Sequence, residues 1–464
     1  MKKKREYIAN NVQKCYYQKQ RGDKFMLIEY RVKNFMSFKE ETVLSMVAEP
    51  IDDLKKTHVF KSGNLSLLKT AGIFGANASG KSNFISSFSF FNDIFSDFTD
   101  MTKVIKKLPY YKFSDSSAKE PISFEITFIL NGKRHRYGIE ITEHGIASEW
   151  LYFVPTRNEA CYFEREGNEI TEKGIYFEPK KALDYIKPDP LRPFLYTLAQ
   201  NSLKEFDWAK EINNYLRFEI HLCNNLDNFY RNMIETELME DSENSFLSKD
   251  LLLRLIKDAD FGIDDIIIEE KSQMEDSLFS EFKEFLKQKG KDFKEDKYET
   301  YMIHNKYDNG FKIGVEKLPI VRESLGTQKF YCLLYPILLI LYYGGILLID
   351  EIESSLHPRL CEKILSLFNS SENNPNNAQL IFTTHNTLLM NPEILRRDQI
   401  YFVEKNKYGE SNLYSLFKED GSIRNGYNYM KNYLAGRFGA IPYLGPFNIN
   451  GLTRGNNNET KKKS

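Results

Sequence analysis

The most chemically informative residues of this chain form one short run, Gly75-Ala76-Asn77-Ala78-Ser79-Gly80-Lys81-Ser82. The run matches the pattern G-x-x-x-x-G-K-[ST], in which glycines let successive backbone N–H groups turn inward around phosphates. In that pattern the lysine reaches the β- and γ-phosphates, and the final hydroxyl binds Mg²⁺. An apolar segment ends at Phe74, and a helical stretch, 83–98, follows, so a helix N-terminus adds positive potential. A chance glycine-rich turn would not require both flanking elements. The sequence therefore predicts a nucleoside triphosphate site that uses Gly75, Asn77, Ser79, Gly80, Lys81, Ser82 and Asn83.

Two adjacent carboxylates, Asp350 and Glu351, follow the apolar run 346–349. This pattern predicts a buried strand whose tip reaches the nucleotide at the end of a parallel sheet. We expect Asp350 to hold Mg²⁺, usually through water, and Glu351 to orient and polarise the attacking water. A buried strand that merely ends in an acidic loop is the alternative, and the phosphate-binding run upstream disfavours it.

Two more segments fit the same chemistry. His385 follows the apolar run 379–382 and two threonines, which places it at the tip of another predicted strand. Ser324-Leu325-Gly326 opens a long apolar helix, and such a turn can present a hydroxyl and backbone N–H groups to a phosphate. Taken alone, this serine is equally well explained as a simple helix cap.

In this order the segments resemble those of ABC-type ATPases of the SMC, RecF and OLD kind. More narrowly, the chain is similar to stand-alone prokaryotic AAA family ATPases that are often found in anti-phage defence loci. Three further segments resemble that group: Val32-Lys33-Asn34-Phe35-Met36-Ser37-Phe38, Ala259-Asp260-Phe261-Gly262-Ile263 and Leu434-Ala435-Gly436-Arg437-Phe438-Gly439-Ala440-Ile441-Pro442. The resemblance extends from Met26 to about Gly445.

The resemblance implies a role for each matching position. ATP and Mg²⁺ would be the ligands, Glu351 and His385 would be catalytic, and hydrolysis would be slow and regulatory. Ser324 and Gly326 would form a signature that closes on ATP held by a second protomer, so the heads would dimerise through two composite sites. Residues 354–357 would be the D-loop that crosses this interface. The chain departs from the group at Met36, where relatives often carry Lys or Arg, and no Q-loop glutamine can be placed between 82 and 149.

Composition narrows the class of protein. The 64 basic and 65 acidic side chains give a net charge of −1, so no global basic field indicates nucleic acid. The five cysteines lack C-x-x-C spacing, which favours free thiols in a reducing cytoplasm. Residues 330–349 carry no charge, yet Pro336 and Gly344-Gly345 interrupt them. We therefore predict a buried helix, a glycine turn and a buried strand there, rather than a membrane span.

The predicted fold class is α/β, a P-loop NTPase of ABC/SMC-head type with a mixed α+β insertion. Residues 1–25 are predicted to be a disordered arm or to lie upstream of the true start codon. The other predicted parts are an N-terminal lobe (26–149), an insertion (150–317), a C-terminal lobe (318–445) and a disordered tail (446–464). Asn131-Gly132 and Asn309-Gly310 predict two hairpin turns.

The leading hypothesis is a regulatory ATPase of phage defence, acting with a separate nuclease-like effector. The segment after His385 is too short for the Toprim nuclease domain that OLD-type relatives often carry. The insertion would dock the partner. The alternative is a RecF-like repair or clamp ATPase, which would need a basic patch such as 103–107 or 287–297 to bind DNA. A non-hydrolysing scaffold and a transporter ATPase fit less well.

Overall fold

A six-stranded sheet forms the centre of the protein, with strand order β11-β15-β16-β5-β17-β18. Its strands are β5 (Thr70–Phe74), β11 (Ile220–Cys223), β15 (Ile346–Ile349), β16 (Gln379–Thr384), β17 (Ile400–Lys405) and β18 (Ser411–Ser415). All neighbours pair in parallel except β17 and β18. Every residue of β15, β16 and β5 is buried, as expected for a parallel sheet covered on both faces. This arrangement confirms the predicted α/β class.

The computed structural model describes residues 25–178, 181, 185–223, 228–240, 245–271, 297–419, 427–442 and 445. The predicted N-terminal arm, except for its last residue, and the predicted tail lie outside the described residues. So does nearly all of the lysine-rich segment 287–297.

Three helices pack on the central sheet: α3 (Lys81–Ile94), α10 (Leu325–Tyr343) and α11 (Pro358–Asn369). α10 contacts β11 and β15, and Gly344-Gly345 joins it to β15, as predicted. Among the described helices, α10 alone has the length and apolarity to cross a membrane, and 72% of its apolar window is buried inside the protein. Pro336, expected to interrupt the segment, lies within the helix and does not end it.

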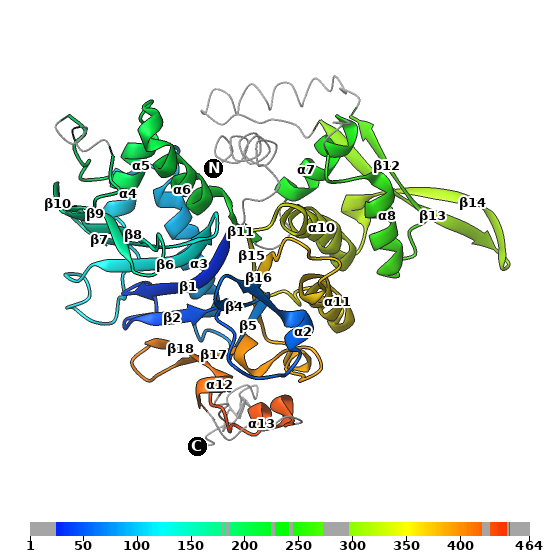
Figure 1. Cartoon of the computed structure of the whole chain (residues 1–464). Helices are drawn as coiled ribbons and strands as arrows, with labels where there is room; N and C mark the ends of the chain where they lie inside the picture. Colours follow the sequence, from blue (N-terminus) through cyan, green and yellow to red (C-terminus); the bar gives the residue numbers. More distant parts are fainter. Residues whose placement is uncertain are drawn as a thin grey trace, which may run out of the picture.

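A seven-stranded antiparallel sheet lies beside the central one, with strand order β10-β9-β8-β7-β6-β1-β2 (Figure 1). Its strands are β1 (Met26–Lys33), β2 (Thr42–Ser45), β6 (Ile122–Leu130), β7 (Lys133–Thr142), β8 (Gly145–Phe153), β9 (Ala160–Glu166) and β10 (Glu169–Lys173). β6 and β7 turn at Asn131-Gly132, where both residues have positive φ, as predicted. β1 pairs with β2 and β6 on its two sides and is therefore an interior strand of this sheet. Its Tyr30 ring stacks on Phe88 of α3, so an aromatic layer joins the sheet to the phosphate-motif helix.

A third group of elements stands on the other side of α10 (Figure 1). It comprises α7 (Asn228–Met239), α8 (Lys249–Asp258) and the antiparallel strands β12 (Asp265–Glu270), β13 (Tyr298–Asp308) and β14 (Phe311–Pro319). The predicted boundary at 149/150 falls inside β8, and β9, β10 and β11 belong to the two large sheets. Among the described residues, the elements of this region that stand apart from both large sheets are therefore α7, α8 and β12 to β14.

The remaining elements span six residues or fewer, except for one 12-residue helix, α6. They are α2 (Lys55–His58), β3 (Val59–Ser62), β4 (Leu65–Leu68), α4 (Met101–Ile105), α5 (Phe194–Ala199), α6 (Asp207–Phe218), α12 (Leu416–Glu419) and α13 (Tyr429–Leu434), with 3₁₀ turns η2 (Lys204–Phe206), η3 (Ile320–Arg322), η4 (Thr387–Leu389) and η5 (Arg397–Gln399).

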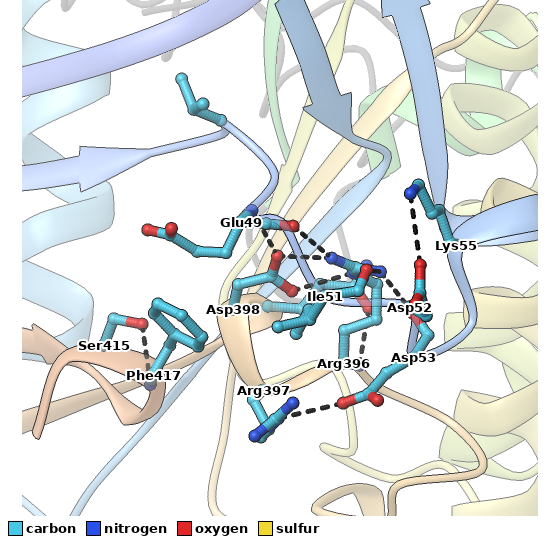
Figure 2. Close-up of polar contacts among 12 residues, drawn as sticks. Glu49, Ile51, Asp52, Asp53, Lys55, Arg396, Arg397, Asp398, Ser415 and Phe417 are labelled. Atoms are coloured by element: carbon cyan, nitrogen blue, oxygen red, sulfur yellow. Dashed lines mark hydrogen bonds and ion pairs between the residues drawn. The ribbon is translucent and has the colours of Figure 1, made fainter. Parts of the chain in front are cut away.

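A buried guanidinium ties the loop after β2 to the turn before β17 (Figure 2). Arg396 is fully buried and pairs with Asp398 at 2.7 Å. It also donates to the carbonyl oxygens of Glu49 and Ile51, each at 3.2 Å, and to that of Asp53. Because the ion pair also satisfies backbone acceptors, its desolvation is compensated by directional bonds.

Candidate functional site

The predicted phosphate-binding run lies in the turn between β5 and α3. The helix begins at Lys81, two residues earlier than the sequence indicated, and ends at Ile94 rather than 98. Gly75 has φ 155° and Gly80 has φ 120°, a region that L side chains rarely adopt. A Cβ at Gly75 would lie 2.4 Å from the Val403 carbonyl oxygen, and one at Gly80 would lie 2.4 Å from the Ser411 hydroxyl. Both glycines are therefore required by conformation and by space.

Lys81 points back into this turn. Its side chain is buried, and Nζ donates to the carbonyl oxygens of Gly75 at 2.9 Å and Ala76 at 3.0 Å. Burial lowers the pKa of Lys81 to about 8, and the nearby carboxylates only partly oppose that effect. The protein groups around the buried ammonium only partly replace its lost hydration. A bound anion would therefore stabilise its charged form.

The register of the parallel strands brings the other predicted side chains to the same edge. Ile349 of β15 pairs with Phe382 of β16. The next residues of the two strands, Asp350 and Thr383, therefore lie side by side. The Thr383 hydroxyl donates to Asp350 Oδ1 at 2.5 Å and accepts from the backbone N–H of Glu351 at 2.8 Å. Thr383 therefore holds the side chain of Asp350 and the backbone of Glu351. The sequence analysis had not identified this threonine as part of the site.

His385 reaches the phosphate-binding turn in the same way. Thr384 of β16 pairs with Phe74 of β5, so the next residue lies beside the turn. His385 Nδ1 lies 3.4 Å from Lys81 Nζ, and its backbone N–H donates to Glu353 Oε1 at 2.6 Å. Burial and the lysine charge lower the pKa of His385, which favours a neutral imidazole.

The polar groups at this edge fit a triphosphate with Mg²⁺. The hydroxyl of Ser79 is buried and has no hydrogen-bond partner in the described part of the chain, as a group reserved for a ligand would be. Ser82 is exposed in the first turn of α3, and the Asp350 carboxylate is half-buried. Within the described ranges no cluster of three or more His, Cys, Asp or Glu side chains could hold a metal. One hydroxyl and one carboxylate suit Mg²⁺, which completes its shell with phosphate oxygens and water.

Ser324 and Gly326 lie at the start of α10 and not in the turn around Lys81. The Ser324 side chain is exposed and accepts from the backbone N–H of Thr327 at 3.1 Å, so it does cap the helix. A Cβ on Gly326 would come within 2.6 Å of the Ser355 carbonyl oxygen. The predicted signature and the predicted D-loop (354–357) therefore pack against each other within one chain. Asn77 is exposed at the tip of the turn.

Sequence reasoning missed several residues that hold the turn. The Ser411 hydroxyl donates to the Ser79 carbonyl at 2.5 Å and is hydrogen-bonded to the Ser37 hydroxyl at 2.8 Å, and the Asn83 side-chain amide donates to Ser37 Oγ at 2.8 Å. The Ala76 N–H donates to the carbonyl of Ala440, inside a segment noted only for its resemblance. Serines in an edge strand give no signal in the sequence, because their role depends on strand order.

A second missed residue is Lys329, on the buried side of α10. Its Nζ donates to the Glu351 carbonyl oxygen at 2.9 Å, and burial lowers its pKa. The helix that carries Ser324 is thereby bonded to the backbone of the predicted catalytic carboxylate. The sequence did offer a signal for this residue, because Lys329 is the one charged residue of α10.

A family model described as "AAA domain, putative AbiEii toxin, Type IV TA system" matches residues 71–391, more than half of the chain. No curated protein matches the sequence. Similar solved structures include the SMC head domain from Thermotoga maritima, at 15% identity and TM-score 0.38 over 84% of this chain and 98% of that one. An SmcHead bound to the C-winged helix domain of ScpA has 13% identity and TM-score 0.42 over 84% and 98%. An Smc head with an extended coiled coil, bound to the C-terminal domain of ScpA derived from Pyrococcus furiosus, has 13% identity and TM-score 0.40 over 89% and 100%.

Proposed function

The chain belongs to the family described as AAA domain, putative AbiEii toxin, Type IV TA system, and on this premise we propose that it binds and slowly hydrolyses ATP to regulate a separate effector protein. The observation that carries the proposal is the meeting of Lys81, Asp350, Glu351 and His385 at one edge of a parallel sheet. That edge is where α/β sheets bind ligands.

Each side chain has a role in the proposed reaction. Protonated Lys81 binds the β- and γ-phosphates together with the N–H groups of the turn, and Ser82 and Asp350 hold Mg²⁺. When bound, Mg²⁺ neutralises charge that develops on the phosphate oxygens during transfer. Glu351 orients the attacking water, with its backbone fixed from two sides by Thr383 and Lys329. His385 contacts the γ-phosphate as a neutral donor and reports whether that phosphate is present.

The second half of each site comes from another copy of the chain. Ser324 is exposed at the N-terminus of a 19-residue helix, where its hydroxyl and the backbone N–H groups can meet the γ-phosphate held by a partner. Residues 354–357 lie directly beside it. ATP would therefore join two heads, and hydrolysis would release them.

The proposed biological role is the ATPase component of a cytoplasmic anti-phage defence system. The family description, which refers to the AbiEii toxin and to type IV toxin–antitoxin systems, supports this proposal. None of the described cysteines is in a disulfide, which suits a reducing compartment. The predicted insertion 150–317 holds the docking region for a nuclease-like effector. Its described elements α7, α8, β12, β13 and most of β14 are the candidates, because the two large sheets do not include them. A RecF-like DNA clamp remains the second candidate, and it rests on the resemblance of the sequence segments alone.

The test uses Glu351→Gln, which keeps the side-chain shape and removes the charge that polarises water. We expect this variant to bind ATP normally, to lose turnover and to form a stable dimer in ATP, measured by light scattering after size exclusion. Lys81→Ala, the matched control, should bind no ATP and form no ATP-dependent dimer. Unchanged turnover in Glu351→Gln would contradict the assigned role.

The same trapped variant identifies the partner. A pull-down with ATP, followed by mass spectrometry and nuclease treatment, should recover a stoichiometric protein encoded beside this chain. Recovery of DNA alone, released by salt, would favour the clamp function instead.

A further inference from the structure

A further carboxylate lies at the proposed ATP site, outside both the predicted catalytic residues and the predicted D-loop. Glu353 follows Glu351 by two residues and directly precedes the D-loop (354–357). Its Oε1 accepts from the backbone N–H of His385 at 2.6 Å. Glu353 therefore joins the segment after β15 to the segment after β16, at the sheet edge where the phosphate-binding turn also lies.

The charge of Glu353 acts on both titratable side chains that meet in the phosphate-binding turn. Burial lowers the pKa of Lys81, and Glu353 opposes this effect more strongly than either predicted carboxylate of the site does. Burial and the lysine charge lower the pKa of His385, and Glu353 is again the strongest opposing carboxylate. Because the interaction of charges weakens with distance, this ranking places Glu353 within the site rather than at its margin.

The second carboxylate oxygen of Glu353 is left unpaired. Oε2 is buried and has no hydrogen-bond partner in the part of the chain that the structure describes. A buried polar atom without a partner costs free energy, so a carboxylate held this way is a poor device for stabilising the fold. Proteins keep such groups mainly at functional sites. The bond from Glu353 to the His385 N–H is therefore better explained by a role in the site.

We propose that Glu353 is a positioning residue that holds His385 where its side chain can meet the γ-phosphate, and that it connects this histidine to the D-loop. The inference rests on the proposed function, because it concerns the same ATP site. The Glu353 carbonyl oxygen accepts from the N–H of Leu356 at 2.9 Å, which closes a turn within the D-loop segment. One residue thus bonds to His385 through its side chain and to the D-loop through its backbone.

This connection gives the proposed dimer a route from the partner to the γ-phosphate contact. The Ser355 carbonyl oxygen lies against Gly326 at the start of α10, so the D-loop packs on the predicted signature. When a second copy meets these two segments, a shift of the D-loop moves the backbone of Glu353 and, through the carboxylate, that of His385. ATP should still bind without this hydrogen bond, because Lys81 and the turn remain, whereas turnover and dimer closure should weaken.

Substitution of Glu353 separates turnover from nucleotide binding. In Glu353→Ala the His385 N–H loses its acceptor, so kcat should fall about tenfold or more, as for the loss of a hydrogen bond to a charged group. ATP affinity, measured at pH 6.5 where Lys81 is protonated, should change by less than about threefold, since the turn still binds the phosphates. Glu353→Gln keeps an acceptor oxygen for the N–H and should restore kcat to within about threefold of wild type. The glutamine variant also controls for misfolding.

A double variant tests whether Glu353 acts through His385. Glu353→Ala should have no further effect on kcat in a His385→Ala background, because the side chain that it positions is then missing. A loss of fold would instead lower kcat in both backgrounds. Glu362→Ala is the matched control, because it removes another half-buried glutamate, from α11, and should leave kcat unchanged.

The ATP-dependent dimer of Glu351→Gln provides a readout that does not require turnover. Addition of Glu353→Ala should raise the dimer dissociation constant about tenfold, measured by light scattering over a series of protein concentrations with saturating ATP. Addition of Glu353→Gln should leave the constant within about threefold, because the hydrogen bond to the His385 N–H is kept.

Three results would overturn this inference and leave the proposed function intact. The first is wild-type kcat in Glu353→Ala. The second is an equal loss of kcat in the alanine and glutamine variants, since the charge and not the hydrogen bond would then matter. The third is the same fold loss in the His385→Ala background as in wild type. Failure of the wild-type chain to bind ATP would instead refute the proposed function, and this inference with it.

Discussion

The lowered pKa of Lys81 makes nucleotide affinity depend on pH. The side chain is 5% exposed, and burial lowers its pKa from 10.5 to about 8. The phosphates would restore the ammonium, so the bound state is protonated over the whole range while the free protein loses its proton above pH 8. Affinity should therefore be constant below pH 7.5 and weaken by about tenfold per pH unit above 8, which corresponds to about 1.4 kcal/mol per unit.

The magnitude at a given pH follows from the protonated fraction. At pH 9 about one tenth of Lys81 carries a proton, so the dissociation constant should be roughly ten times that at pH 7. The same shift affects folding with a definite sign. Below pH 8 the folded chain holds a poorly solvated ammonium, at a cost of up to about 3 kcal/mol. Between pH 8 and 10.5 the unfolded chain binds more protons than the folded chain, so this contribution to stability rises with pH.

The assay is titration calorimetry of the Glu351→Gln variant with Mg-ATP from pH 7 to 9.5. Buffers with different ionisation enthalpies should reveal uptake of about one proton at pH 9 and almost none at pH 7. Lys81→Arg is the matched control, because its guanidinium stays charged and should remove the pH dependence over this range. A flat affinity up to pH 9.5 in the Lys81 protein, with no proton uptake, would refute the reasoning.

Further substitutions test the frame around the site. Lys329→Met should lower kcat at least tenfold while changing ATP affinity less than threefold, because it frees the carbonyl of Glu351 without touching the phosphate turn; a change in affinity alone would contradict this. Gly326→Ala should weaken ATP-dependent dimerisation, since its Cβ meets the Ser355 carbonyl at 2.6 Å, and nucleotide binding by the monomer should be unaffected. Arg396→Leu should destabilise the protein by about 3–5 kcal/mol in urea unfolding, because it leaves a buried carboxylate unpaired.

Local patterns in the sequence predicted the elements that carry the site. Glycine-rich spacing placed the phosphate turn, and the apolar runs before Asp350 and His385 predicted buried strands, because parallel strands must be apolar on both faces. Asn131-Gly132 and Asn309-Gly310 predicted hairpins because both residues of such turns need positive φ. Serine is a preferred residue directly before a helix, and the Ser248 side chain caps α8 by accepting from Leu251 N–H at 3.2 Å.

Features that depend on strand order could not be predicted. β1 alternates apolar and polar residues, and this pattern reports only that one face of the sheet is buried and the other partly exposed; it does not show that β2 and β6 pair with the strand on both sides. Acidic residues usually lie on a solvated surface, but Glu235 is buried and accepts from the Thr300 hydroxyl at 2.9 Å. Ser411 and Ser37 hold the phosphate turn only because β18 and the end of β1 meet there.

The position of Lys329 argues that dimer closure and catalysis are coupled through one rigid helix. Ser324 caps α10 at the exposed end, and Lys329 lies just over one helical turn further along, where it bonds to the Glu351 carbonyl. Gly326, between them, lets the helix approach the segment after Glu351 closely. In the proposed dimer, a phosphate held by the partner that pulls on the helix N-terminus would therefore move the backbone of Glu351, the proposed catalytic carboxylate, without an intervening flexible segment. On this reasoning Ser324→Ala and Lys329→Met should not be additive in turnover, because both interrupt the same connection.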